Sequence, residues 1–159
     1  MGSRATPATT AARRAGIEYA VHEYDHDPRA PAYGLEAAER LGLDPTRVLK
    51  TLVAALDGEA YAVALVPAEQ QLDLKALAAA AGAKRAAMAD PADAERATGY
   101  VVGGISPLGQ RRRLPMFVDS SAPAEGSVYV SAGRRGLEIE LLLEDLLRLT
   151  GGRQAPIAR

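Results

Sequence analysis

The chain has 159 residues, 48% of them hydrophobic, and a formal net charge of -1, which fits one compact domain and excludes a protein that is basic as a whole. It contains no cysteine, which excludes disulfides, thiolate metal sites and a cysteine nucleophile. No apolar run approaches the roughly 20 residues that cross a bilayer. The first ten residues also lack the apolar stretch of a signal peptide, so we expect a cytoplasmic protein without membrane contact.

Prolines and aspartates near helix starts, and glycines after helix ends, mark the elements of the first half of the chain. Alternating apolar residues indicate strands, and Asp57-Gly58 is a favourable pair for a hairpin turn. The expected elements are, in order, a helix over Pro7–Ala15, a strand over Ile17–Tyr24, a loop over 25–34, a helix over Leu35–Leu41, a capped turn at Asp44-Pro45, and strands over Thr51–Leu56 and Ala60–Val66.

The same signals continue through the second half of the chain. The expected elements are helices over Leu72–Ala81 and from Asp90-Pro91 to about Thr98, strands over Met116–Asp119, Val128–Ser131 and Leu137–Glu140, and a last helix over Leu141–Leu149. Helices and strands are mixed without strict alternation of strand and helix. This order predicts an α+β fold, with helices packed over a mixed sheet in a single domain that spans residues 1–159.

Familiar catalytic motifs are missing. Ser106 stands in G-x-S-x-x-G, which differs from the G-x-S-x-G turn of hydrolases, and no Gly-rich motif for nucleotide phosphates is present. His22 and His26 are four residues apart, a spacing that on a strand puts both on one face. Two histidines are too few for a catalytic zinc site, so we expect surface or hydrogen-bonded histidines and no metal.

A glycine-rich stretch, GYVVGGISPLGQRRRLP over 99–115, is the most informative segment. Gly103, Gly104 and Gly109 allow backbone N–H groups to approach a ligand, and Pro107 stiffens the bend. Such a loop can offer amides to a carbonyl oxygen that gains negative charge. A tight structural turn explains the same residues equally well.

Two arginine groups and one lysine add positive charge near this segment. Arg111, Arg112 and Arg113 together with Arg134 and Arg135 predict a phosphate-binding patch, although each group alone is more typical of a solvated face. The aromatic content of 4% argues against a platform that stacks bases. Lys50 stands where the chain enters an apolar strand. Its side chain either extends to solvent or points into a cleft as a fixed cation.

Several stretches, taken in order, resemble one family. The chain is similar to the YbaK/EbsC family of bacterial Cys-tRNA(Pro) deacylases, which belongs to the superfamily of the prolyl-tRNA synthetase editing domain. The resemblance runs from about Pro7 to the C-terminus and implies that family's barrel-like sheet core with surrounding helices. The matching stretches are HEYDHDP over 22–28, RVLKTLV over 47–53, QQLDLKALA over 70–78, ATGYVVGGISPLGQRRRLP over 97–115 and VYVSAGRRGLEIEL over 128–141.

The resemblance implies an activity and a set of site residues. Prolyl-tRNA synthetase charges cysteine by mistake because a pocket rejects a near-isostere poorly. Members of the family hydrolyse the resulting Cys-tRNA(Pro) in trans, and the thiol of the substrate attacks the ester. The resemblance therefore implies no cofactor and no metal, with Lys50 as the essential lysine and the loop Gly103–Pro107 near the reacting carbonyl. The implied pocket residues are Tyr24, Gly103, Gly104, Ile105, Ser106, Pro107, Ser131 and Glu138.

The sequence departs from the family pattern at two places. Many members carry aspartate at the position of Glu138, and many have two glycines where this chain has Ala132-Gly133. Both changes leave the aminoacyl preference open, with a deacylase for Ala- or Ser-charged tRNA as one alternative. A module that binds tRNA or the synthetase without turnover is another. The implied partners are aminoacyl-tRNA for proline and, transiently, prolyl-tRNA synthetase.

Overall fold

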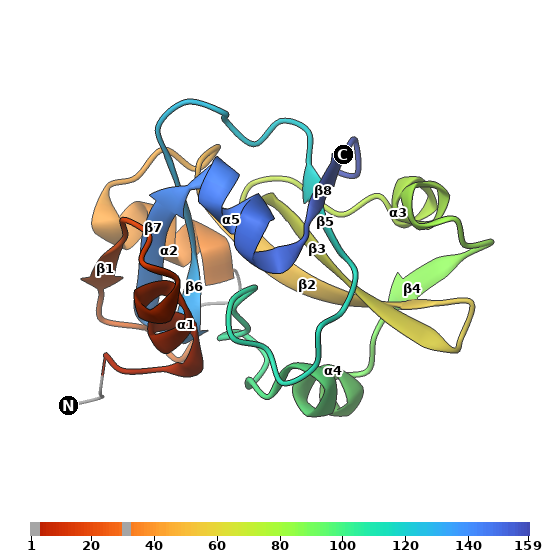
Figure 1. The fold of residues 1–159 in the computed structure, drawn as a ribbon, viewed down its shortest axis with the longest axis horizontal. Coiled ribbons are helices and arrows are strands. Elements are labelled where there is room, and N and C mark those ends of the chain that lie inside the picture. Colours follow the sequence, from red (N-terminus) through yellow and green to blue (C-terminus); the bar gives the residue numbers. More distant parts are fainter. Residues whose placement is uncertain (1–3, 30–32) are drawn as a thin grey trace.

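Two β-sheets organise the chain, the smaller on the left and the larger on the right of Figure 1. The computed structural model describes residues 4–29 and 33–159. The smaller sheet is antiparallel and has the order β1-β7-β6, and the larger has the order β4-β2-β3-β5-β8, with parallel pairing of β5 to both neighbours. The strands are β1 (Ala20–Glu23), β2 (Leu49–Leu56), β3 (Ala60–Pro67), β4 (Ala86–Met88), β5 (Met116–Asp119), β6 (Ser127–Arg134), β7 (Leu137–Leu142) and β8 (Arg153–Ala155).

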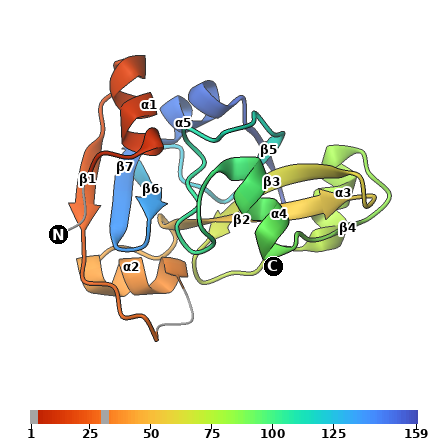
Figure 2. The same ribbon diagram turned by 90° about the horizontal axis from the view of Figure 1, so that it is seen from below.

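Five helices surround these sheets in the described part of the chain. Helices α1 and α2 lie at opposite ends of the smaller sheet, as Figure 2 shows. The α+β prediction is confirmed, because helices and mixed sheets are combined without regular alternation. The helices are α1 (Pro7–Ala15), α2 (Tyr33–Leu41), α3 (Leu74–Ala81), α4 (Pro91–Thr98) and α5 (Leu143–Thr150).

The helix ends follow local chemistry. The Thr6 hydroxyl accepts the Thr9 N–H, and the Thr9 hydroxyl accepts the Thr6 N–H, which completes a capping box before Pro7. Gly16 ends α1 in the left-handed conformation at φ 70°. The predicted boundaries of α1 are confirmed to the residue, and α4 begins at Pro91 and ends at Thr98, about where it was predicted to end, because these signals act locally.

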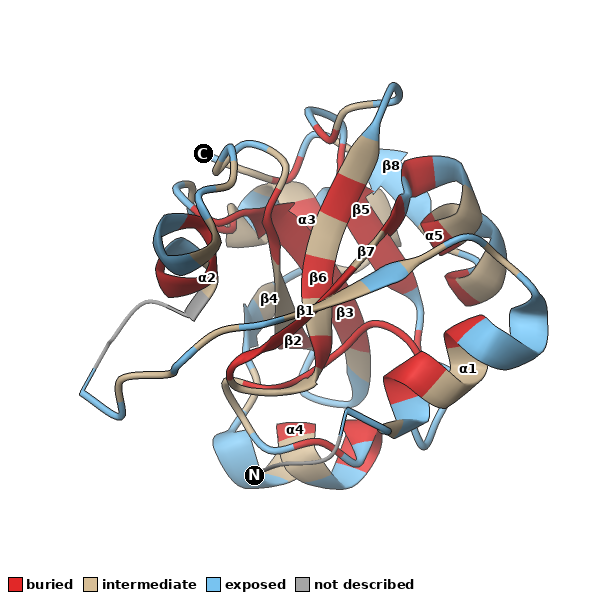
Figure 3. Ribbon diagram, turned by 90° about the vertical axis from the view of Figure 1, so that its left-hand side faces the viewer, coloured by how far each residue is buried: buried red, intermediate tan, exposed pale blue. Residues whose placement is uncertain are grey.

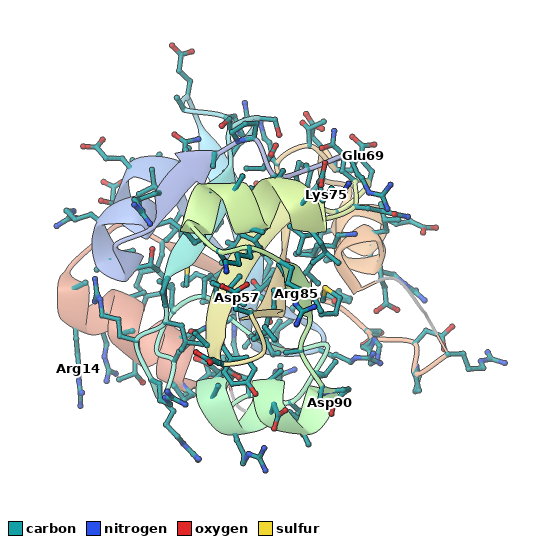
Figure 4. All side chains as sticks on the ribbon, turned by 90° about the vertical axis from the view of Figure 1, so that its right-hand side faces the viewer. Arg14, Asp57, Glu69, Lys75, Arg85 and Asp90 are labelled. Carbon is teal, nitrogen blue, oxygen red and sulfur yellow. The ribbon has the colours of Figure 1, made fainter. Side chains whose placement is uncertain are left out.

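The hairpin of β2 and β3 turns at Asp57-Gly58, as predicted, with both residues at positive φ. The Asp57 carboxylate accepts the backbone N–H groups of Lys84 and Arg85, each at 3.0 Å. Figure 4 shows Asp57 and Arg85 next to each other beneath α3. These bonds join the hairpin to the start of β4, a strand that the sequence did not predict.

Several predicted boundaries are wrong by a few residues. The first strand covers only Ala20–Glu23, and the last helix starts at Leu143 because Leu141 and Leu142 continue β7 and pair with β6. Helix α2 begins at Tyr33, within the predicted loop. In each case long-range strand pairing or helix packing overrides the local pattern.

The buried residues lie in the strands, on the inner faces of the helices and in several connecting segments (Figure 3). One large cluster joins both sheets, since Leu49 and Val53 of β2 belong to it together with Val130 and Ile139 of the smaller sheet. The sheets also meet at a bridge between Val48 and Tyr129. Across the described ranges, no helix has the length and apolar character needed to span a bilayer.

Candidate active site

A cavity of about 260 Å³ lies between the two sheets, on the side of β2 that faces β6. Its walls come from elements far apart in the sequence, so it exists only in the folded chain. The lining residues are Tyr24, Gly34, Leu49, Lys50, Thr51, Leu52, Val53, Met88, Ala89, Pro91, Ala94, Val102, Gly103, Ile105, Ser131, Arg134 and Glu138.

Two polar residues of the smaller sheet, together with Tyr24 directly after β1, form one end of this cavity. Ser131 of β6 and Glu138 of β7 are directly opposite each other in the strand register, so their side chains share a face. Burial raises the pKa of the Glu138 carboxyl to about 8, so the protonated form prevails at neutral pH. Burial, with the nearby charge of Glu138, raises the pKa of Tyr24 to about 12. This end of the cavity therefore offers hydrogen-bond donors.

Lys50 of β2 lines the same cavity from the larger sheet, which favours the cleft over solvent for its side chain. Its Cβ lies 3.6 Å from the position that a Cβ on Gly34 would occupy, at the start of α2. Burial alone lowers the pKa of Lys50. Among the ion pairs of residues 4–29 and 33–159, none involves Lys50, so its charge is available for an anionic ligand.

The other end of the cavity is apolar and was not foreseen from the sequence. Met88, Ala89, Pro91 and Ala94 line it from β4, α4 and the segment between them. Small apolar residues are also typical of ordinary core helices, so their pattern carried no signal for a site. Thr51 was missed as well, although it directly follows Lys50.

The glycine-rich segment forms a turn at the cavity wall. Gly103 has φ 95°, and the Gly104 N–H donates to the Val101 carbonyl at 2.8 Å, which closes the turn. The Glu95 carboxylate of α4 accepts the Val102 N–H at 2.9 Å. Because the Gly104 N–H is used within the turn, Gly103 is the glycine of this pair whose amide suits a substrate oxygen.

Gly104 has a second role, since a Cβ there would lie 2.7 Å from the Arg134 Cα. We expect Gly104→Ala to displace the turn from β6, lower stability by about 2–3 kcal/mol and reduce activity. Gly16→Ala is a matched control: no atom lies within 4 Å of its added Cβ, so only left-handed backbone strain of about 1 kcal/mol applies. Urea denaturation of both variants measures the difference, and equal losses would contradict the close approach.

The remaining loop residues lie at different depths. Ile105 lines the cavity, whereas Ser106 is fully buried and its hydroxyl accepts the Leu108 N–H. Pro107 lines a second cavity, beside α1 and α5. Ser106 and Pro107 thus shape the loop from behind the cavity wall.

Three of the five predicted arginines line cavities, and they are divided between two of them. Arg134 lines the first cavity, while Arg112 and Arg113 line the second. The Arg113 guanidinium comes within 2.7 Å of a Cβ placed on Gly151, at the C-terminal end of α5, where a cation is favourable. Arg111 lies against Gly99 instead. Arg135 donates to the Nε2 atom of His26 at 2.8 Å.

Both histidines are hydrogen-bonded, as expected. The Nδ1 atom of His26 contacts buried Glu36 at 2.6 Å, and His22 contacts Glu140 at 2.8 Å. They do not share a strand face, because β1 ends at Glu23 before His26. Within the described ranges, no group of three or more potential metal-ligating side chains occurs.

Ala132, one of the departures from the family pattern, is fully buried in the large cluster that joins the sheets and is not among the cavity-lining residues. It lies where the β6–β7 register shifts between Ser131 and Arg134. Its methyl group therefore packs into the core.

Comparison with known proteins matches the chain to a family. The model of the aminoacyl-tRNA editing domain matches residues 29–149. A protein of Enterococcus faecalis named "Putative Cys-tRNA(Pro)/Cys-tRNA(Cys) deacylase EbsC" is 42% identical over 120 residues, which cover 76% of this chain and 73% of that protein. The "Multifunctional Ser/Thr-tRNA deacylase ProXp-y" of Escherichia coli is 36% identical over 73 residues, 44% of each chain.

The fold has close relatives among solved structures. One described as a "putative trans-editing enzyme for prolyl tRNA synthetase" superimposes with a TM-score of 0.87, covers 100% of this chain and 99% of that chain, and is 24% identical. The resemblance to YbaK/EbsC proteins and the prediction of an aminoacyl-tRNA deacylase are confirmed by the family model and the relatives. The chain therefore belongs to the family of aminoacyl-tRNA editing domains.

Proposed function

We propose that this chain hydrolyses Cys-tRNA(Pro) in trans and so prevents cysteine from entering proteins at proline codons. The observation that carries this proposal is the joint presence of Lys50, Gly103, Ser131 and Glu138 around one cavity. That cavity holds a cation, hydrogen-bond donors and a glycine turn, yet the chain contains no cysteine. Such a site suits a reaction in which the substrate supplies its own nucleophile.

The proposed chemistry starts at the thiol of the substrate. The sulfur, after losing its proton, attacks the ester carbonyl and forms a tetrahedral oxyanion in a four-membered ring. The bond to the ribose oxygen then breaks, that oxygen takes up a proton, and the tRNA leaves. Water opens the remaining thiolactone to release cysteine. Positioning and charge stabilisation are the contributions required of the protein, and together they supply several powers of ten in rate.

The residues take the following proposed roles. The Lys50 ammonium stabilises the anionic groups at the tRNA terminus, either the developing oxyanion or the phosphate of the terminal nucleotide. The Gly103 amide approaches the carbonyl oxygen. Protonated Glu138 donates a hydrogen bond at neutral pH, as its raised pKa allows, and Tyr24 and Ser131 hold the ribose end of the substrate.

The proposed partners follow from the substrate. With a net charge of -1, the chain supplies little long-range attraction for tRNA. Prolyl-tRNA synthetase therefore supplies specificity for tRNA(Pro) in a transient complex, in the cytoplasm where tRNA is charged. Arg134 is the arginine best placed to reach the tRNA terminus, because it lines the cavity.

The relative from Escherichia coli makes serine the main alternative aminoacyl group, since its name describes a Ser/Thr-tRNA deacylase. Deacylation of Cys-, Ser- and Ala-tRNA(Pro) at equal protein concentration separates these substrates. We expect Cys-tRNA(Pro) to be cleaved at least about tenfold faster than Ser-tRNA(Pro), because a thiol is the better nucleophile near neutral pH. Equal rates would contradict attack by the thiol and favour the serine alternative.

A further inference from the structure

Thr51 is a cavity residue whose hydroxyl the fold does not use. It lies on β2 directly after Lys50, and its side chain faces the side of the strand that carries Leu49 and Val53. The Thr51 Oγ1 atom is buried, and within residues 4–29 and 33–159 it has no hydrogen-bond partner. A buried hydroxyl without a partner costs about 1–3 kcal/mol, whereas valine has the same shape without that cost. The stability of the fold therefore does not explain why this residue is threonine.

The backbone of β2 is also open at this residue. The Arg47 carbonyl accepts the Tyr129 N–H, and the Val53 carbonyl accepts the Ala89 N–H. Backbone groups of alternate residues point to the same side of a strand, so those of Thr51 point to this side too. Between these two bonds, the described ranges contain no strand that pairs with this side of β2. The cavity thus borders an unpaired stretch of β2 at Thr51.

Thr51 lies between the two ends of the cavity. Lys50 precedes it on the side of β6, and Val53 follows it on the side of β4, as the strand register shows. Lys50 and Thr51 lie on opposite faces of β2, because side chains alternate along a strand, and both border the cavity at the unpaired edge. An ester held near Lys50 and Glu138 would extend a short side chain across this edge toward the Thr51 hydroxyl. A group that both donates and accepts a hydrogen bond suits a thiol or a hydroxyl and offers nothing to a methyl group.

We infer that Thr51 is a substrate-binding residue that recognises the polar atom of the aminoacyl side chain and thereby favours cysteinyl and seryl esters over alanyl esters. This inference rests on the proposed function, because it takes the cavity to be the deacylation site. It adds a residue that neither the family resemblance nor the sequence motifs singled out. Recognition by a buried polar group penalises an analogue that leaves this group unpaired.

The test compares Thr51→Val, which removes the hydroxyl, with Thr51→Ser, which keeps it. We expect Thr51→Val to lower kcat/KM for Cys-tRNA(Pro) and Ser-tRNA(Pro) about five- to tenfold, the effect of one hydrogen bond. The slow residual hydrolysis of Ala-tRNA(Pro), whose side chain supplies no nucleophile, should be unchanged. Thr51→Ser should stay within about twofold of the unaltered chain, since the hydroxyl is retained. The melting temperature of Thr51→Val should be equal or higher, because an unpaired buried hydroxyl is removed.

Three results would overturn the inference: full activity of Thr51→Val on both polar substrates, equal losses on all three substrates, or a lower melting temperature that accounts for the lost activity. Failure of the proposed function is seen separately, in the unaltered chain. If that chain cleaves Ser-tRNA(Pro) but not Cys-tRNA(Pro), the cysteine assignment is wrong. The comparison of Thr51 variants on the seryl ester then still tests whether Thr51 recognises the polar atom of the aminoacyl side chain.

Discussion

Replacing Lys50 by methionine should lower the rate of single-turnover Cys-tRNA(Pro) deacylation about 100- to 1000-fold, the loss typical of removing one group that stabilises a developing oxyanion. Methionine keeps the apolar stem of the side chain and removes the charge. Because burial lowers the pKa of Lys50, the folded state disfavours its charged form, and Lys50→Met should fold at least as stably as the unaltered chain. Activity and stability are thus expected to change independently.

Lys75→Met is the matched control. Lys75 is exposed on α3, on the face shown in Figure 4, and does not line the cavity. The same change of charge there should leave deacylation within about twofold, because screening weakens interactions between distant surface charges. Near-normal hydrolysis by Lys50→Met, or an equal loss in both variants, would remove Lys50 from the proposed mechanism.

Replacing Glu138 by glutamine should change the pH dependence of stability. The pKa of this carboxyl is about 8 in the folded chain, above its ordinary value of 4.5. The proton binds more tightly to the folded state, so the stabilisation that it provides is complete below pH 4.5 and is lost as the pH rises toward 8. Glutamine resembles the protonated carboxyl and does not titrate. Relative to the unaltered chain, Glu138→Gln should therefore gain about 3–5 kcal/mol between pH 5 and pH 9.

Glu140→Gln provides a control on the same strand with the opposite sign. Burial alone would raise the pKa of Glu140. Hydrogen bonds from His22, Ser127 and Tyr129 lower this pKa by more than burial raises it, so the net shift is downward. Its contribution is present above the ordinary pKa of 4.5 and lost in acid, so Glu140→Gln should be less stable than the unaltered chain at neutral pH. Urea denaturation from pH 5 to pH 9 measures both variants. Parallel curves for Glu138→Gln and the unaltered chain would show that Glu138 is not a buried, protonated acid.

The helices with local end signals were predictable from the sequence. Thr6-Pro7 and Gly16 define α1, and Pro91 and Gly99 define α4, because capping depends on neighbouring residues alone. The three-residue strands β4 and β8 were not predictable. Arg153–Ala155 carries no alternation of apolar and polar residues, and it is a strand only because it pairs with β5.

The features of the site likewise divide into those that the sequence indicated and those that it did not. The family resemblance pointed to Lys50 and Glu138, and the structure places both at one cavity. It did not show that the Gly104 N–H closes a turn, or that Thr51 has a buried and unpaired hydroxyl, since both facts depend on contacts in three dimensions. The arginines were grouped by their charge in the sequence, yet Arg113 lies at the end of α5 and Arg134 at the cavity.

The walls of the cavity come from both ends of the chain, from Tyr24 after β1 to Glu138 on β7. A nascent chain that has left the ribosome only as far as β5 therefore has its lysine and its glycine turn but lacks the sheet that carries Ser131 and Glu138. The cavity is therefore complete only after β6 and β7 have joined the fold.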